Sequence, residues 1–234
     1  FVQSTETNHI SIMSLAFQHA TLHKAWKLCF MNKIIHQDID SILFRVGIER
    51  FQRLAGKTVL ITGPQGLLAA YLVETIAILN ASYLSSPCHI VCISRSPITT
   101  TSRLGHLRDN PYCYFMTADI AWPVIIEHCD FIIHAAGRSA PQVFTDDPIG
   151  TLSVNLALMG LLEKARADHA EAVLYFSSSE IYGSPPANKI PTPETYWGST
   201  DSLGSRSCYT EAKRCGEALC MAYFRQHQVP VKIV

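Results

Sequence analysis

The residues best suited to chemistry lie late in the chain. Tyr209 and Lys213 are four positions apart, so in a helix both side chains project from one face. A phenol with a pKa of about 10 is a poor base at neutral pH, but a nearby ammonium group favours the phenolate. Ser177, Ser178 and Ser179 precede this pair, and a serine hydroxyl can hold a substrate oxygen whose proton the phenolate takes. These five residues therefore form a candidate proton-transfer site.

A second group of residues is typical of a dinucleotide site. Gly63-x-x-Gly66-x-x-Ala69 lies between an apolar strand-like run and a helix-like run. Gly63 allows a sharp turn, and Gly66 lets a pyrophosphate approach a helix N-terminus, where free N–H groups favour an anion. The small Ala69 permits close packing of helix on strand. We predict that this turn, with Gln65 and Leu67, contacts a dinucleotide.

The end of the second expected strand leaves the form of the cofactor open. In NAD sites this strand ends in Asp or Glu, which binds the ribose hydroxyls. Here the sequence reads Ser94-Arg95-Ser96. Arg95 is suited to stacking on adenine or to pairing with the 2′-phosphate of NADP, and it is equally consistent with a solvated surface position. These residues therefore leave the choice between NAD and NADP open.

Alternating strands and helices must position these groups. The strand-like runs are nearly continuous in apolar residues, which is typical of a parallel sheet buried on both faces. The predicted fold class is α/β, a doubly wound parallel sheet. A long loop rich in Pro, Gly, Ser and Thr at 184–204 is expected to be functional. Strands are expected at 57–62, 89–94, 112–117, 131–135, 172–177 and 229–234, and helices at about 67–80, 148–167 and 205–227.

Residues 1–55 have a different pattern, and we predict a helical N-terminal extension followed by a nucleotide-binding domain at 56–234. One amphipathic pattern begins at Ser14, and a second has Ile35, Ile39, Ile42, Val46 and Arg50 on one stripe, with Leu43, Phe51 and Leu54 beside it. The chain begins with Phe1 and stops at Val234 inside an apolar run. Both ends look cut, and the nucleotide-binding domain is expected to be truncated in its sixth strand.

Composition restricts the class of protein. Hydrophobic residues make up 48% of the chain and charged residues 16%, which supplies a core and argues against disorder. Nineteen basic and nineteen acidic side chains give zero net charge. This balance argues against nucleic-acid binding and favours self-association, so a homodimer is expected. No apolar run reaches the ~20 residues of a membrane span, and no metal site is predicted. Eight scattered cysteines indicate a reducing, cytoplasmic compartment.

Together these residues resemble a known family, the extended short-chain dehydrogenases/reductases of the NAD-dependent epimerase/dehydratase group. The resemblance covers about residues 56–234, and it implies that the C-terminal substrate region of the family lies beyond Val234. Within the group, the segments Pro193–Gly198 and Ser207–Tyr209 are most similar to UDP-glucuronate decarboxylases. The resemblance rests on the glycine motif and on Asp119-Ile120, His134-Ala135-Ala136-Gly137, Asn155, Ser177-Ser178-Ser179-Glu180-Ile181-Tyr182-Gly183 and Tyr209-x-x-x-Lys213.

The resemblance implies roles for individual residues. Asp119 and Ile120 would contact adenine, Ala135, Ala136 and Gly137 would line the cofactor, and Asn155 would support the sheet near the site. Ser178 aligns with the Ser/Thr that binds substrate beside the catalytic Tyr209, and Lys213 would hold the nicotinamide ribose.

The positions after Ser178 separate the activities within the group. Dehydratases carry Asp-Glu there, whereas this chain has Ser179 and Glu180. The missing Asp disfavours 4,6-dehydration, and simple 4-epimerases usually lack the Glu. The resemblance thus implies oxidation of a UDP-linked nucleotide sugar at C4, followed by loss of CO₂. A 4-epimerase or 4,6-dehydratase on the same scaffold and a non-catalytic dinucleotide-binding sensor or scaffold remain alternatives.

Overall fold

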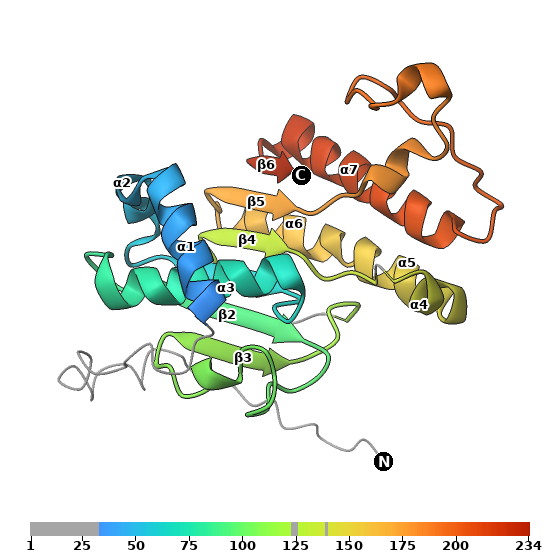
Figure 1. Cartoon of the computed structure of the whole chain (residues 1–234). Coiled ribbons are helices and arrows are strands. Elements are labelled where there is room, and N and C mark those ends of the chain that lie inside the picture. The colour runs from blue at the N-terminus through green and yellow to red at the C-terminus, as the bar shows by residue number, and fades with distance from the viewer. Residues whose placement is uncertain (1–32, 123–125, 139) are drawn as a thin grey trace, which may run out of the picture.

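The chain forms a six-stranded parallel sheet with helices on both faces (Figure 1). The computed structural model describes residues 33–122, 126–138 and 140–234. The strand order is β3-β2-β1-β4-β5-β6, which confirms the predicted doubly wound sheet. The strands are β1 (Thr58–Thr62), β2 (His89–Ser94), β3 (Cys113–Thr117), β4 (Phe131–His134), β5 (Ala172–Tyr175) and β6 (Val231–Ile233).

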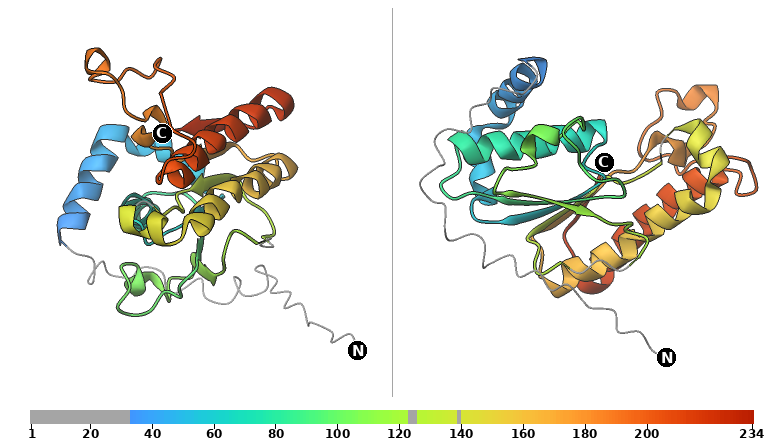
Figure 2. Two further views of the ribbon diagram at one scale, coloured as in Figure 1. Left: turned by 90° about the vertical axis from the view of Figure 1, so that its right-hand side faces the viewer. Right: turned by 90° about the horizontal axis from the view of Figure 1, so that it is seen from below.

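The helices form a layer on each side of the sheet. In Figure 2, α1 and α3 cover one face, while α5, α6 and α7 cover the other. The α-helices are α1 (Lys33–Val46), α2 (Ile48–Phe51), α3 (Leu67–Ser82), α4 (Pro141–Asp146), α5 (Pro148–Leu156), α6 (Leu158–Ala167) and α7 (Ser207–His227). Short 3₁₀ helices are η2 (Gln52–Leu54), η3 (Gly105–Leu107), η4 (Ser179–Tyr182) and η5 (Ala187–Lys189).

Alternate residues of β1 to β4 pack into two separate cores, one on each face of the sheet. Val59 and Ile61 of β1 pack with α3 in one core, whereas Leu60, between them, packs with α6 in the other. Both faces of the strand are buried because successive side chains point to opposite sides of the sheet. This explains why the strands read as continuous apolar runs in the sequence.

Helix α1 adds a further layer outside α3. Its buried residues Ile39 and Leu43 are four positions apart and pack against Ile78 and Leu79 of α3. The helix ends before Gly47, which has a φ of +89°. The predicted stripe therefore does not continue, and Val46 and Arg50 are exposed. The earlier amphipathic pattern that begins at Ser14 lies outside the described residues.

The segment between β4 and β5 forms three helices, α4, α5 and α6, where the sequence predicts one. The helical prediction at 148–167 corresponds to α5 and α6, separated only by Ala157, whose N–H still bonds to the Ser153 carbonyl oxygen. Asp147 caps α5 by accepting a hydrogen bond from the Gly150 N–H. Helix α4 was not predicted, because its six residues are too few to show a period.

The chain order places a site at one edge of the sheet. Strand β1 lies between β2 and β4, and Thr62 at its carboxyl end is in register with Ile93 and His134. The connections run in opposite directions from β1, so its carboxyl end is the switch point where open α/β sheets bind ligands.

Candidate functional site

The turn after β1 opens a groove at this switch point. Gly63 has a φ of +67°, and a Cβ atom there would lie 2.7 Å from the Ala136 Cα, so only glycine fits. Gly66 is the N-cap residue of α3 and offers no capping side chain. A Cβ atom on Gly66 would approach only the Gly63 carbonyl oxygen, at 3.4 Å. The first N–H groups of α3 are therefore accessible to an anion.

Buried polar side chains fix the two strands that border this groove. The Thr62 hydroxyl of β1 lies 2.8 Å from the His134 Nδ1 of β4, and it also accepts a hydrogen bond from the Ala136 N–H. Burial, and then the charge of Lys213, lower the pKa of His134 to about 3, so the imidazole is neutral. This contact holds the backbone of 135–137 against the glycine turn.

The groove has a volume of about 210 Å³, and most of the predicted cofactor residues line it. Leu67 and Asp119 are not among its lining residues. Leu67 is exposed at the start of α3, and the Asp119 Oδ1 accepts the Ala121 N–H. The predicted residues that line the groove are Gly63, Gln65, Gly66, Arg95, Ile120, Ala135, Ala136 and Gly137.

The sequence interpretation missed Arg138, which also lines the groove. Its guanidinium group forms an ion pair with Asp147, the cap of α5. The signal was present, because Arg138 directly follows the Ala135-Ala136-Gly137 segment. The groove thus combines a helix N-terminus with two arginines, which fits the pyrophosphate and ribose of a dinucleotide.

Helix α7 carries Tyr209 and Lys213 into the protein near the other end of the groove. Both side chains are buried, with exposed fractions of 8% and 5%. The Lys213 Nζ donates to the Phe176 carbonyl oxygen at 2.7 Å and lies 6.0 Å from the centre of the Tyr209 ring. A Cβ atom on Gly137 would lie 3.8 Å from this Nζ, which joins the lysine to the groove.

Burial lowers the pKa of Lys213 to about 8, from an ordinary value of 10.5. At neutral pH the side chain remains an ammonium group, but it is easily deprotonated for a lysine. Its charge lies beside the Tyr209 ring, in the arrangement that the Tyr-x-x-x-Lys spacing predicts.

The serines after β5 have separate partners. The Ser177 hydroxyl donates a hydrogen bond to the Glu217 Oε1 of α7 at 2.6 Å, so its proton is already engaged. Ser178 is the N-cap of η4, and its hydroxyl oxygen accepts the Glu180 N–H at 3.2 Å. Ser179 lines a large pocket next to this turn. Ser178 and Ser179 thus lie at the start of a 3₁₀ helix that packs against α7.

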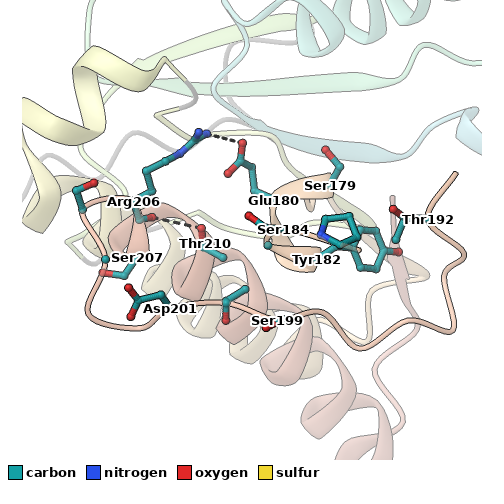
Figure 3. A pocket seen from close by; sticks show the side chains of 15 residues that line it. Ser179, Glu180, Tyr182, Ser184, Thr192, Ser199, Asp201, Arg206, Ser207 and Thr210 are labelled. Carbon is teal, nitrogen blue, oxygen red and sulfur yellow. Dashed lines mark hydrogen bonds and ion pairs between the residues drawn. The ribbon is translucent and has the colours of Figure 1, made fainter. Parts of the chain in front are cut away.

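Figure 3 shows this second cavity, whose volume is about 900 Å³. It lies between η4, the loop at 184–206 and the start of α7. The Glu180 carboxylate and the Arg206 guanidinium form an ion pair of 2.5 Å across it. Asp201 is the other acidic lining residue, and hydroxyl groups dominate the rest. Such a polar cavity suits a ligand with many hydroxyl groups, such as a sugar.

Two further residues that the sequence interpretation missed, Phe144 and Arg206, continue a stack that begins at the Tyr209 ring. The buried Phe144 of α4 stacks on the Tyr209 ring with centroids 5.3 Å apart. The Arg206 guanidinium lies over the Phe144 ring, 5.6 Å from its centre. Arg206 precedes Tyr209 by three residues, a spacing that could have indicated a shared helix face. No sequence pattern pointed to Phe144.

The loop at 184–206 is fixed to α7. The Arg214 Nη1 donates to the carbonyl oxygens of Ile181 and Trp197, both at 2.9 Å. Thr200 donates to the Glu211 Oε1 at 2.6 Å. These contacts hold the wall of the larger cavity beside the helix that carries Tyr209. Tyr209 and Ser178 are not among the lining residues of either cavity.

The fold and the glycine groove define a nucleotide-binding protein of the doubly wound α/β class. The sequence profile of the NAD dependent epimerase/dehydratase family matches residues 59–234, which is most of the chain. The chain belongs to this family of enzymes.

Curated relatives give a more specific similarity. The chain is 31% identical over 179 residues to UDP-glucuronic acid decarboxylase 1 of Arabidopsis thaliana, covering 75% of this chain and 38% of the relative. It is also 31% identical over 182 residues to UDP-glucuronic acid decarboxylase 1 of Xenopus tropicalis, covering 76% and 40%. The chain thus spans less than half the length of these relatives.

Solved structures share the fold. A UDP-galactose 4-epimerase superposes with a TM-score of 0.58 and 26% identity, covering 75% of this chain and 54% of that structure. The UDP-glucuronic acid 4-epimerase of Bacillus cereus, solved with UDP-glucuronic acid and NAD, has a TM-score of 0.59 and 21% identity, covering 75% and 55%. Among the residues described, no helix is long and apolar enough to cross a membrane.

Proposed function

We propose that the protein containing this chain is a nucleotide-sugar decarboxylase that acts on UDP-glucuronate. The observation that carries this proposal is the position of Glu180, which follows Ser178 and Ser179 in η4 and faces the larger cavity (Figure 3). The similarity to UDP-glucuronic acid decarboxylases supports it. A 4-epimerase is the second candidate, because a UDP-glucuronic acid 4-epimerase shares the fold.

The chain's own residues suggest how the reaction proceeds. Tyr209 takes the proton of the sugar 4-hydroxyl, Ser178 hydrogen-bonds the same oxygen, and Lys213 supplies positive charge beside the phenolate. A nicotinamide cofactor held in the groove would supply the capacity to take up a hydride from C4 and to give it back. Gly63, Gly66 and Gly137 would hold the cofactor along the groove, with Lys213 at its ribose.

Decarboxylation follows from the chemistry of the oxidised sugar. A ketone at C4 makes the C5 carboxylate a β-keto acid, so the C5–carboxylate bond breaks and its electron pair moves to the C4 oxygen. C5 must then receive a proton. We assign this proton transfer to Glu180, which lines the larger cavity beside Arg206 and would relay the proton from solvent to C5.

The direct test uses the full-length protein with NAD⁺ and UDP-glucuronate. Release of CO₂ together with UDP-xylose is the expected result. Formation of UDP-galacturonate without CO₂ would favour the 4-epimerase. Turnover of UDP-glucose or UDP-galactose, with none of UDP-glucuronate, would refute the proposal.

A pair of matched variants tests the role of Glu180. Glu180→Gln keeps the side-chain shape and should lower CO₂ release by about 100-fold or more, because proton transfer typically contributes that much. Glu194→Gln removes a carboxylate from the same loop region but outside the cavity, and it should leave the rate unchanged. Equal rates in both variants would remove Glu180 from the mechanism.

We also propose a homodimer in a reducing, cytoplasmic compartment. Large apolar side chains on α5 and α6 are exposed, including Ile149, Leu156 and Met159 at 76%, 50% and 55%. The cysteines of the sheet, Cys92 and Cys113, are buried and unpaired. Sedimentation of the full-length protein should give twice the monomer mass, and a monomer at micromolar concentration would contradict the dimer.

A further inference from the structure

Lys213 is a buried cation whose described neighbours include no anionic partner. Its side chain is 5% exposed, and it forms no ion pair with any residue that the structure describes. The Nζ donates a hydrogen bond to the Phe176 carbonyl oxygen at 2.7 Å. An ammonium group has three N–H donors, and burial away from water favours the neutral amine. Another neighbouring group is therefore needed to stabilise the positive charge beside Tyr209.

The ring of Tyr175 is placed to stabilise this charge. The Lys213 Nζ lies over the ring, 5.0 Å from its centre, which is closer than the 6.0 Å to the centre of the Tyr209 ring. Tyr175 is the last residue of β5, next to Phe176, and it is fully buried. The face of an aromatic ring attracts a cation, most strongly where water is excluded. Strand β5 and the residue after it thus offer the ammonium group a ring and a carbonyl oxygen.

The surrounding elements fix the position of the Tyr175 ring. His134 of β4 stacks on it, with centroids 5.9 Å apart and an angle of 12° between the planes. A Cβ atom at Gly216 would overlap the Tyr175 hydroxyl, so this glycine makes room for the tyrosine inside α7, where glycine otherwise costs helix stability. The hydroxyl itself makes only long hydrogen bonds of 3.4 Å, to the Asn155 Oδ1 and the Lys213 carbonyl oxygen.

The other titratable groups near Lys213 do not neutralise it. Burial, and then the charge of Lys213, lower the pKa of His134 on β4 to about 3, so this imidazole is neutral. Burial raises the pKa of Tyr175, so its phenol stays protonated at neutral pH and is not a base. On α7, the Glu217 carboxylate is hydrogen-bonded to a serine hydroxyl, and Tyr209 is the proposed base. The ring face of Tyr175 is therefore the part of this side chain that acts on the lysine.

From these contacts we propose that Tyr175 is a positioning residue, whose ring face holds the charged Lys213 side chain beside Tyr209. The inference rests on the proposed function in taking Lys213 and Tyr209 as the reacting pair. No bond to Tyr175 forms or breaks, and the ring acts only through the lysine. Its effect should therefore be measurable in the titration of Lys213 without substrate.

A graded change of the ring tests the contact in the full-length protein without cofactor. Fluorine withdraws negative charge from the face of an aromatic ring and changes its size little. Position 175 is therefore occupied in turn by phenylalanine and by its mono-, di- and trifluorinated forms. NMR of ¹³C-labelled lysine follows the Lys213 Cε signal with pH, and Lys213→Met assigns that signal.

The pKa of Lys213, about 8 in the wild-type protein, should stay near that value in Tyr175→Phe and fall with each added fluorine. A pKa that does not change across the series would overturn the proposal. Because every member of the series keeps a ring of nearly the same size, the test does not depend on a variant with a cavity.

Tyr175→Leu removes the ring and should lower the pKa of Lys213 to about 7. The charged fraction of the lysine then falls by about twofold at pH 7 and about fivefold at pH 8, and kcat should fall by the same factors while KM changes little. Tyr175→Phe should restore kcat. An equal loss of kcat at every pH, or a higher pKa for Lys213, would contradict the proposal.

Tyr114→Leu is the matched control. Tyr114 is a strand tyrosine on β3 that packs against the same core as Tyr175, and β3 is separated from β5 by three strands. This variant should lose stability without changing the titration of Lys213. A similar fall in the pKa of Lys213 in both leucine variants would show a general effect of loosened packing and would overturn the proposal.

The inference and the proposed function fail separately. If fluorination shifts the titration of Lys213 but the protein releases no CO₂ from UDP-glucuronate, the proposed substrate is refuted and the role of the Tyr175 ring stands. If CO₂ is released but the titration does not respond to fluorination, the decarboxylase stands and the role of the ring is refuted.

Discussion

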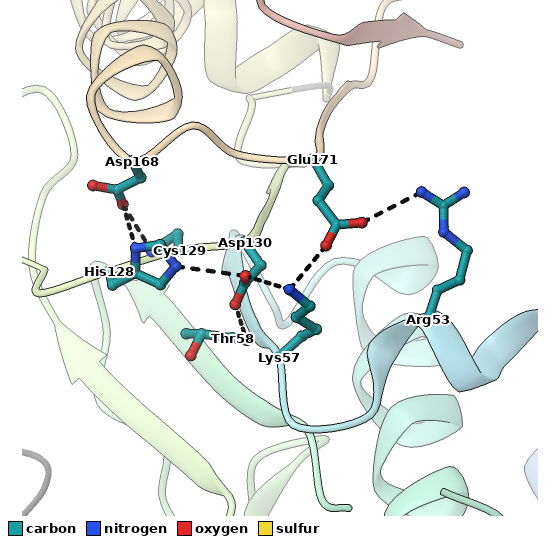
Figure 4. A network of polar contacts seen from close by, with 8 residues as sticks. All are labelled: Arg53, Lys57, Thr58, His128, Cys129, Asp130, Asp168 and Glu171. Carbon is teal, nitrogen blue, oxygen red and sulfur yellow. Dashed lines mark hydrogen bonds and ion pairs between the residues drawn. The ribbon is translucent and has the colours of Figure 1, made fainter.

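The two edges of the sheet both gather charged residues, but they use them differently. At the amino-terminal edge, Lys57 contacts Asp130 at 3.0 Å and Glu171 at 2.9 Å, and Lys164 contacts Asp168 at 2.6 Å (Figure 4 shows all but Lys164). Each of these three carboxylates is paired. At the carboxyl-terminal edge, the Lys213 ammonium donates to the Phe176 carbonyl oxygen and lies over the rings of Tyr175 and Tyr209, and neither Lys213 nor Arg95 has an ion pair among the described residues.

This difference shows how one sheet can serve both stability and chemistry. The paired carboxylates at the amino-terminal edge also hold chain segments together. Asp130 accepts a hydrogen bond from the Thr58 N–H, and the Asp168 Oδ2 accepts one from the Cys129 N–H. Charges left without partners of opposite sign remain available to a ligand. The comparison predicts that variants at the carboxyl edge alter reactions and variants at the amino edge alter stability.

The largest effect is expected for Tyr209→Phe. Removing the hydroxyl removes the proposed base, so turnover of UDP-glucuronate should fall by roughly 10²–10⁴-fold. Dinucleotide binding and the urea midpoint should change little, because the ring and its stacking on Phe144 are kept. Steady-state rates and calorimetry check this. Unchanged turnover would refute the role of Tyr209.

Next in size is the pH dependence conferred by Lys213. Its pKa in the folded protein is about 8, below the value of 10.5 expected on unfolding, so between pH 8 and 10.5 the unfolded state binds more protons. Stability from this group therefore rises with pH across that window, by about 3 kcal/mol in total.

Lys213→Met removes the titrating group and isolates this contribution. Urea unfolding at several pH values from 7.5 to 10.5 should show a rise in the wild-type protein that the variant lacks. Other lysines and tyrosines titrate in both proteins, so only the difference between the two curves is diagnostic. Parallel curves would contradict a depressed pKa for Lys213.

A smaller effect is expected at the amino edge for Asp130→Asn. Burial opposes ionisation of Asp130, but hydrogen bonds from the Thr58 N–H and from Lys57 outweigh it and lower the pKa of the carboxyl group. The carboxylate thus stabilises the fold above its unfolded pKa of about 3.9, and this contribution is lost as the pH falls below that value.

We expect Asp130→Asn to lower the free energy of unfolding by about 1–2 kcal/mol at pH 7. The difference from the wild-type protein should shrink below about pH 4. Denaturant titration measures both. Dinucleotide affinity should stay the same, and a loss of affinity larger than the loss of stability would contradict the separation of the two edges.

The smallest effect is expected for Arg53→Gln. The Arg53 guanidinium contacts the Glu171 Oε2 at 3.3 Å, but the side chain is 74% exposed. Water and salt screen such a pair, so the loss should be below about 0.5 kcal/mol. Thermal unfolding at low and high salt would detect a larger, salt-sensitive loss, which would show that the ion pairs act as one network.

Much of the fold was predictable because each element has a local signal. The strands read as apolar runs, and all six lie within two residues of their predicted bounds. The groove was predictable because Gly63 and Gly66 are required by backbone geometry at a single turn. By contrast, Gly47 interrupts the first described helix although the apolar stripe continues past it.

The larger cavity was less predictable because its contacts join distant segments. The Glu180–Arg206 ion pair spans 26 positions, and the Tyr209 ring stacks on Phe144 from another helix. No local pattern records such pairs. Ser177, Ser178 and Ser179 show the same limit. They are adjacent in the sequence, but in the structure the Ser177 hydroxyl donates to Glu217 while Ser178 caps η4.

By itself, the sequence determined the parallel sheet, the glycine turn and the spacing of Tyr209 and Lys213, because periodicity and short motifs are local properties of the chain. Only the tertiary structure decided which charged groups are neutralised. Arg138 forms an ion pair with Asp147, and Arg206 forms one with Glu180, whereas Arg95 lines the groove without an ion pair among the described residues. The physical reason is that pairing of charges depends on distance in space, and the fold sets that distance.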